Sequence, residues 1–283
     1  MARKPRPPNL PDFKRPPVSE VVLSVQFRAL EAFGNAHAGL LWHKFRREYP
    51  DHSEQSPLQP VFETFGSAQR SAANRGLQIE TLLSPPMSRF WFLEADGREL
   101  IQVQQDRFIH NWRKRGDEQL YPRYETIRER FGQEIRTFER FVQEEMLGDL
   151  KPNQCEVTYI NVIEFADETE PFRALQRVTP LWAGQLSEHS ELEFDSNTIG
   201  CRCILRESDR PIGRIHARFV PAHRALDERP VVRLEITARA RPTEESLPSA
   251  FSLLDRERQE IVRFFAAVTT PEMHQLWERT DGR

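Results

Sequence analysis

Glycine is scarce in this sequence, and the short motifs that depend on it are missing. The chain of 283 residues contains 12 glycines, and it has neither a GxxxxGK[ST] loop nor a GxGxxG fingerprint. Both motifs need glycine so that backbone amides can approach a phosphate group. GxSxG, HExxH and CxxC are missing as well. These absences argue against P-loop, dinucleotide-binding, α/β-hydrolase and zinc-protease sites, and they favour a protein that binds rather than catalyses.

Cysteine and long apolar runs are also rare. Three cysteines cannot build a framework of disulfide bridges, and a reducing cytoplasm suits them best. No apolar run approaches the roughly 20 residues that span a bilayer. The N-terminus lacks the apolar centre of a signal peptide. We therefore expect a cytoplasmic protein without a membrane partner.

Positive charge comes almost entirely from arginine. The chain has 35 arginines and 5 lysines, and its net charge is −3. That net charge provides no global attraction to nucleic acid, although arginine forks suit bidentate contacts. No lysine follows Lys151, which argues against a nuclease that combines carboxylates with a lysine. The acidic residues Glu191, Glu193 and Asp195 are therefore expected to form a solvated strand edge.

Metal-ligating residues form only a weak pattern. Cys201 and Cys203 are two residues apart on a predicted strand, so both thiols share a face, and His216 could lie on a neighbouring strand. Cysteine also packs well inside a core. Cys155 shares a face with apolar residues, which is typical of an inert buried thiol. We expect neither a metal nor a cofactor.

The first 17 residues differ in composition from the rest. They contain six prolines and five lysines or arginines. Proline fixes φ and lacks an amide donor, so residues 1–17 are predicted to form an extended basic arm. The arm either drapes over the surface or grips a partner.

The N-terminal half, residues 18–150, reads as an α+β unit. Apolar residues alternate with polar ones along its first strand, which indicates a half-buried strand. Asp96–Gly97 predicts a tight hairpin between its last two strands. The predicted elements are a strand at 18–27, a helix at 36–49, strands at 60–65, 77–82, 89–95 and 99–113, and a helix at 121–147. The expected inward stripe of that last helix is Tyr124, Ile127, Phe131, Ile135, Phe138, Val142 and Met146.

The C-terminal half, residues 151–283, repeats this order. Its predicted elements are a strand at 153–165, a short helix at 170–182, strands at 191–195, 198–207, 211–220 and 231–241, a helix at 251–268 and a final helix after Thr270. The matching order favours a duplication. Two such units can join into one curved antiparallel sheet with helices on one face. The predicted architecture is therefore a saddle like that of TATA-box-binding proteins.

Basic residues gather on one face of two of these strands. Arg214, His216 and Arg218 alternate with apolar residues, and so do Arg233 and Arg239. If the two strands pair, these side chains form a basic patch away from the helices. The patch is either an ordinary solvated face partly neutralised by Glu235, or a surface for an anion, an acidic protein or nucleic acid.

Several stretches of the chain resemble a known family. "LIQVQQDRFIHNWRKRGD", "YPRYETIRERF" and "PNQCEVTYIN" are similar to motifs of a sporadically distributed bacterial family of similar length. The opening "PPVSEVVLSVQF" and the closing "TTPEMHQLWER" also resemble it, so the likeness covers nearly the whole chain. The family has no established activity, so the resemblance transfers no catalytic residue. Its patchy distribution implies carriage with mobile or defence loci.

The first of these motifs is a predicted strand with polar groups on both faces. On one strand, Asp106 and His110 would lie about 13 Å apart, so they predict no catalytic triad. We expect the polar groups of 102–113 and 153–161 to meet where the two halves join. They would form either a structural hydrogen-bonded seam or a recognition pocket. The seam residues are Gln102, Gln104, Asp106, Arg107, His110, Asn111, Trp112, Arg113, Asn153, Gln154, Glu156, Thr158 and Asn161.

These observations lead to three hypotheses about function. The first is a non-catalytic protein that captures a protein partner, such as a toxin or a defence component. The second is a nucleic-acid-binding saddle that uses the basic face and the basic arm. The third is an enzyme with an unrecognised polar pocket between the halves, which would have to gather Asp106, His110 and Glu156 in one cleft.

Overall fold

The first long strand of the chain lies in the middle of the sheet. The computed structural model describes residues 10–66, 88–116, 120–165, 171–183, 196–224 and 227–280. β2 (Val18–Phe27) pairs antiparallel with β6 (Arg107–Arg113) on one side and with β7 (Pro152–Glu164) on the other. Its inward residues pack fully into the core, as the alternation predicts. The two halves of the chain therefore join along the β2–β7 ladder.

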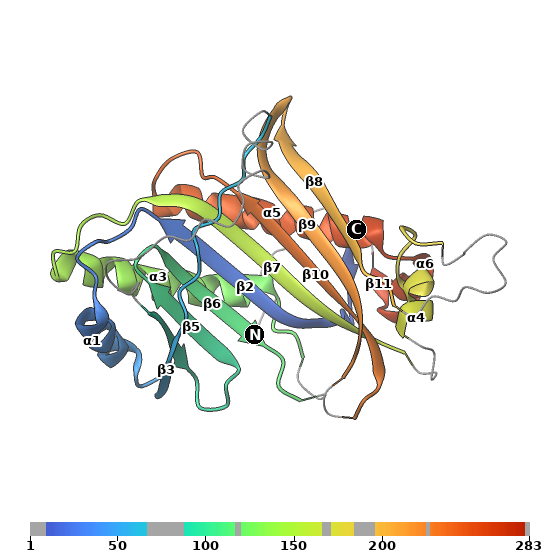
Figure 1. Cartoon of the computed structure of the whole chain (residues 1–283), viewed down its shortest axis with the longest axis horizontal. Helices are drawn as coiled ribbons and strands as arrows, with labels where there is room; N and C mark the ends of the chain where they lie inside the picture. The colour runs from blue at the N-terminus through green and yellow to red at the C-terminus, as the bar shows by residue number, and fades with distance from the viewer. Residues whose placement is uncertain are drawn as a thin grey trace.

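One antiparallel sheet of nine strands extends from this centre (Figure 1). Its strand order is β3-β4-β5-β6-β2-β7-β10-β9-β8. On the N-terminal side lie β3 (Asp51–Gln55), β4 (Arg89–Leu93) and β5 (Glu99–Gln104). On the C-terminal side lie β10 (Pro230–Ala240), β9 (Arg210–His223) and β8 (Ile199–Glu207). The predicted α+β class with a large antiparallel sheet is confirmed.

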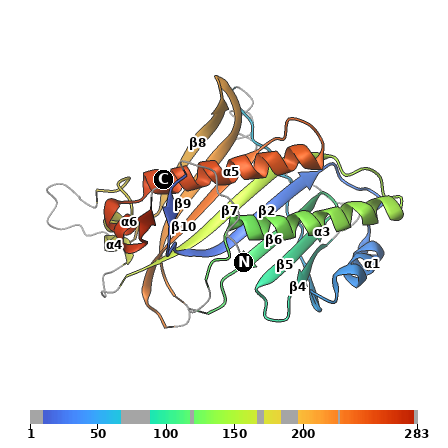
Figure 2. The same ribbon diagram turned by 180° about the vertical axis from the view of Figure 1, so that it is seen from behind.

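Two long helices cover one face of the sheet (Figure 2). They are α3 (Tyr124–Glu144) and α5 (Leu247–Val268). Their three- and four-residue spacing of apolar side chains places one stripe of each on the strands. Phe138 of α3, for example, lies 5.3 Å from Phe108 of β6 between ring centroids. We call the opposite face, which is turned to the viewer in Figure 1, the open face.

Shorter helices lie at the ends of the sheet. They are α1 (Asn35–Phe45), α4 (Pro171–Val178) and α6 (Pro271–Leu276). Thr270 caps α6 by accepting a hydrogen bond from the amide of Met273, as predicted. None of the helices in the described ranges combines the length and the apolar composition that a bilayer crossing requires.

The described part of the N-terminal arm packs against the C-terminal end of the chain. β1 (Asp12–Phe13) pairs with β11 (Arg279–Thr280). Phe13 is buried, and its ring lies 5.3 Å from that of Phe265 on α5. Residues 10–17 are thus held by the fold rather than free to grip a partner. Residues 1–9 lie outside the described residues.

The prediction of one long strand over 99–113 is wrong. The segment is a hairpin, in which β5 and β6 pair across the two-residue turn Gln105–Asp106. Asp106 is a residue type that is common in turns, but the turn contains no glycine, proline or asparagine, so its sequence signal is weak. Because the chain reverses at this turn, β5 and β6 are two paired strands. Cross-strand partners lie on the same face of the sheet, so each strand has one face toward the helices and one toward the open face.

Other predicted details differ from the structure. Residues 60–65 do not form a strand. The strand in this part of the chain is β3, which lies earlier, at Asp51–Gln55. Met146 follows the end of α3 at a φ of 52° and is exposed. The strands predicted at 77–82 and 191–195 lie outside the described residues.

Candidate functional site beneath a strap on the open face

The β5–β6 hairpin divides the predicted polar seam between the two faces of the sheet. Gln102 pairs with Ile109, Gln104 with Arg107, and Leu100 with Asn111, all on the open face. Ile101 pairs with His110 and Glu99 with Trp112 on the helix face. In addition, β2 lies between β6 and β7, so residues 102–113 and 153–161 do not meet directly. The prediction of a single seam at the junction is therefore wrong.

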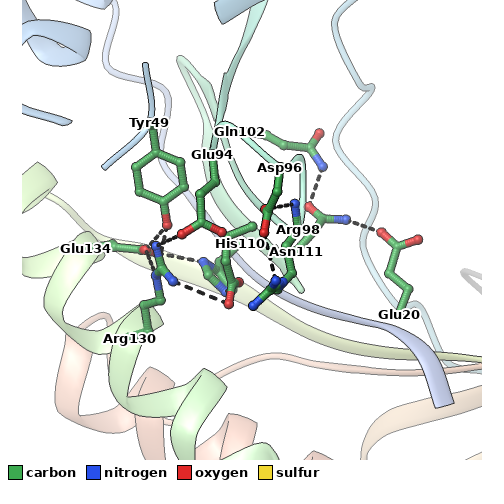
Figure 3. A network of polar contacts seen from close by, with 11 residues as sticks. Glu20, Tyr49, Glu94, Asp96, Arg98, Gln102, His110, Asn111, Arg130 and Glu134 are labelled. Atoms are coloured by element: carbon green, nitrogen blue, oxygen red, sulfur yellow. Dashed lines mark hydrogen bonds and ion pairs between the residues drawn. The ribbon is translucent and has the colours of Figure 1, made fainter. Parts of the chain in front are cut away.

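On the helix face, His110 lies at the centre of a closed ion network (Figure 3). Its side chain is fully buried, with Nδ1 2.7 Å from Oε2 of Glu134 and Nε2 3.0 Å from Oε2 of Glu99. Burial alone lowers the pKa of His110, but the two carboxylates outweigh it and raise that pKa to about 9. His110 is therefore an imidazolium ion at neutral pH.

Tyr49 and Arg130 complete this network. The hydroxyl of Tyr49 donates to Glu134, and burial followed by the charge of Glu134 raises the pKa of that hydroxyl. Arg130 reaches Oε1 of both Glu134 and Glu99, at 3.3 and 3.4 Å. The partners of the network are all side chains of the fold. Its geometry accounts for a structural role, which fits the demand that buried charges be paired.

On the open face, a segment without regular structure crosses the strands. Residues 56–66, which we call the strap, leave β3 and run in front of the sheet toward β8 and β9 (Figure 1). The backbone of Leu58 exchanges two hydrogen bonds of 2.8 Å with the side chain of Gln104. Arg107 donates to the carbonyl of Gln59 at 2.9 Å. The amide of Val61 donates to Gln26 at 3.2 Å.

The far end of the strap sits on the predicted basic face. Glu63, whose side chain is 7% exposed, contacts Arg214, His216 and Arg239 together. Its Oε1 lies 2.7 Å from Nε2 of His216 and 3.3 Å from Nη1 of Arg239. Burial acts to raise the pKa of Glu63, but His216 and Arg214 lower it below its usual range. Glu63 is therefore a buried carboxylate surrounded by positive charge.

This contact changes the predicted basic face. β9 and β10 do pair as predicted, with Arg214 opposite Arg239 and Arg218 opposite Glu235. However, Arg214 and Arg239 are held by Glu63, and Arg239 also pairs with Glu156. Arg233 pairs with Glu235 at 2.8 Å, while Arg218 is exposed. The patch is thus largely neutralised within the chain.

Between the strap and the sheet lies a cavity of about 420 Å³ that is lined by both polar and apolar side chains. Its walls come from the strap, from the central strands β2 and β7 and from the flanking strands β4, β5, β6 and β10. Of the predicted seam residues, four line it: Gln102, Arg107, Gln154 and Glu156. The polar residues that sequence reasoning missed are Ser24, Gln26, Arg89 and, from the strap, Gln59.

The remaining seam residues lie around the cavity or on the other face. Asp106 accepts hydrogen bonds from Gln104 and Arg107 beside the cavity, while Asn153 accepts one from Gln26 at 3.2 Å. Three other positions form hydrogen bonds: Asn111 donates to Glu20, Thr158 bonds Thr237, and Asn161 donates to the carbonyl of Leu234. Arg113 lies over the ring of Trp91, and Trp112 is buried in the core.

The cleft that the enzyme hypothesis requires does not form. His110 points to the helix face, whereas Asp106 and Glu156 lie on the open face, so the three groups are separated by the sheet. Cys155 is fully buried, and burial raises the pKa of its thiol, as expected for an inert cysteine. In the ranges that the structure describes, no group of three or more His, Cys, Asp and Glu side chains is arranged to hold a metal ion.

Comparison with known proteins adds no assignment to this geometry. The sequence matches no family model and no curated protein.

Proposed function

We propose that the chain is a non-catalytic cytoplasmic binding protein that captures a protein partner by an extended, acidic segment of that partner. The observation that carries the proposal is the contact of Glu63 with Arg214, His216 and Arg239. The strap, an extended segment of the chain that presents a carboxylate, already lies on this face, which supports the proposal. In this proposal the strap is an internal competitor that a partner displaces. The resemblance to a patchily distributed bacterial family favours a toxin or defence component as the partner.

The arrangement of the elements supports the finer architecture that we propose, a saddle built from two duplicated units, 18–150 and 151–283. In the first unit, β2 lies next to the last strand, β6, followed outward by β5 and β4. In the second unit, β7 lies next to β10, followed by β9 and β8. In each unit a long helix on the same face follows the sheet strands, α3 in the first unit and α5, before α6 and β11, in the second. A duplication accounts for both orders at once.

A second candidate is nucleic-acid binding on the same face. One observation favours it: the guanidinium groups of Arg89 and Arg113 both lie over the ring of Trp91, 5.5 and 5.9 Å from its centroid. Aromatic and arginine planes of this kind can stack on exposed bases. Two observations oppose it, namely the neutralisation of Arg214 and Arg239 by Glu63 and the net charge of −3.

Partner capture can be tested by weakening the strap. A fluorescent peptide with the sequence of residues 56–66 should bind the Glu63→Gln variant about tenfold more tightly than wild type, because the internal carboxylate no longer competes. The same peptide with glutamine in place of Glu63 should not bind. Exposed Glu48 offers a matched control, since Glu48→Gln removes the same charge far from the strap. Equal binding to all three proteins would rule out the competitor role.

A pull-down from the native host then separates the two candidates. Glu63→Gln as bait should recover more of one protein than wild type does, and nuclease treatment should not change that recovery. Arg239→Gln should lose that protein. Recovery of nucleic acid, with protein lost after nuclease, would instead support the nucleic-acid candidate.

A further inference from the structure

The cavity beneath the strap contains hydrogen-bond donors without partners. Gln154 is 4% exposed, and its Nε2 has no hydrogen-bond partner among the described residues. Within the same described ranges, the buried Nε of Arg89 also has none. Both residues line the cavity. Buried donors of this kind cost free energy unless something accepts from them.

Three side chains that line the cavity already use acceptor oxygens within the chain. Oε1 of Gln102 accepts from Nη1 of Arg89 at 2.8 Å and from the indole of Trp91 at 3.0 Å. Oε1 of Gln26 accepts from Arg107 at 3.1 Å and from the amide of Val61. Glu156 accepts from Arg239. Gln102, Gln26 and Glu156 thus satisfy donors of the chain, whereas the donors of Gln154 and Arg89 remain available to a ligand.

The charged residues of the cavity wall also favour an anionic ligand. Arg89, Arg107 and Arg239 line the cavity, against the single carboxylate of Glu156. Arg107 has Asp106 and Arg239 has Glu156 as ion-pair partners, whereas no ion pair of Arg89 is found in the described part of the chain. Burial, and then the nearby charge of Arg107, lowers the pKa of Arg89. An anion between these two arginines would relieve their repulsion.

We propose that this cavity is a binding site for a small molecule that carries an oxyanion, either a phosphate or a carboxylate group. The unpartnered Nε of Arg89 and the amide of Gln154 would donate to the oxygens of such a group, and the charge of Arg107 would attract it further. The volume of about 420 Å³ falls in the range of cavities that hold small ligands. The inference does not depend on capture of a protein partner.

Isothermal titration calorimetry on the full chain tests this site. The probes are inorganic phosphate, pyrophosphate and citrate, at an ionic strength held constant with sodium chloride, and glucose serves as a neutral polar control. At least one of the three anions should bind with 1:1 stoichiometry, and glucose should not bind. Comparing the affinities for phosphate and pyrophosphate with the affinity for citrate distinguishes a phosphate-binding site from a carboxylate-binding site. Absence of binding by all three anions, or equal binding of glucose, would overturn the proposal.

Variants place the binding in the cavity. Arg89→Gln is expected to weaken anion affinity at least about tenfold. It removes the arginine of the cavity wall for which no carboxylate partner is found among the described residues. Gln154→Leu, which removes the unpartnered donor, should weaken it less and serves if Arg89→Gln fails to fold. Arg98→Gln is the matched control, because Arg98 lies in the turn between β4 and β5, where it pairs with Asp96. Equal affinity of Arg89→Gln, Gln154→Leu and Arg98→Gln would show that the anion binds elsewhere.

Discussion

The buried imidazole of His110 holds its proton because two carboxylates flank it. Its pKa in the folded chain is about 9, above the value of 6.5 that is usual for an exposed histidine. A raised pKa means that the folded state binds the proton more tightly than the unfolded state. The stability contributed by His110 is therefore complete below pH 6.5 and is lost as the pH rises through 9.

We expect the free energy of unfolding in urea to fall between pH 6.5 and pH 9, by roughly 3 kcal/mol if His110 dominates. His110→Asn should remove this dependence and destabilise the protein by about 3–5 kcal/mol at pH 6.5, because Glu99 and Glu134 lose their central partner. The exposed His43 provides the control, and His43→Asn should keep the wild-type pH profile. A flat profile in the wild type would contradict the proposed charge of His110.

At the scale of one element, the far end of the strap is held by the ionic contacts of one carboxylate, Glu63. Val61 and Phe62 are exposed, so few apolar contacts hold this part of the chain on the sheet. Glu63 is buried among three basic groups instead. Loss of that carboxylate removes the ion pairs that Glu63 makes with Arg214 and Arg239.

We expect Glu63→Gln to speed chymotryptic cleavage after Phe62 and Phe65 by about tenfold, which corresponds to a loss of roughly 1.4 kcal/mol in local stability. Mass spectrometry of the early fragments measures the effect. Glu48→Gln should cleave at the wild-type rate. Unchanged cleavage in Glu63→Gln would mean that the hydrogen bonds of Leu58 and Gln59 alone hold the strap.

Elements with strong periodicity could be predicted from the sequence, and the strap could not. The apolar stripes of α3 and α5 and the alternation in β2, β9 and β10 report directly which side faces the core. Residues 60–65 alternate in the same way, yet they lie across a sheet face rather than in it. Glu63 meets partners 151 to 176 positions later in the chain, and no local pattern encodes such a contact.

The hairpin at Gln105–Asp106 was missed for a different reason. Its turn has Asp106 as its one typical turn residue and no glycine, and alternation continues through it. Treating it as one strand placed His110 and Asp106 on one face. In the structure, the two residues lie on opposite sides of the sheet. Four of the 13 predicted seam residues line the cavity, because polar positions on β5 to β7 were recognised even though their faces were not.

At the scale of the whole molecule, contacts cross the boundary between residues 150 and 151 in several places. β2 pairs with β7, the strap reaches β9 and β10, and β1 pairs with β11. The N-terminal unit thus supplies the partner of the first strand of the C-terminal unit. Neither unit is expected to be stable alone.

We expect differential scanning calorimetry to show one unfolding transition, because the sheet is continuous across both units. His110→Asn in the first unit should move the whole transition to lower temperature rather than split it. Two resolved transitions, or a stable isolated 151–283 fragment, would show that the units fold independently.

The strap has an inner side over the cavity and an anchor on the basic face, so one segment forms part of both proposed sites. A ligand that bridges the strap and the sheet would stabilise the seated strap, while a partner would require its release. The two binding events would then be antagonistic. Thermodynamic reciprocity requires that the anion lower partner affinity by the same factor as the partner lowers anion affinity. The affinity of the chain for its protein partner would thus fall as the concentration of the small anion rises.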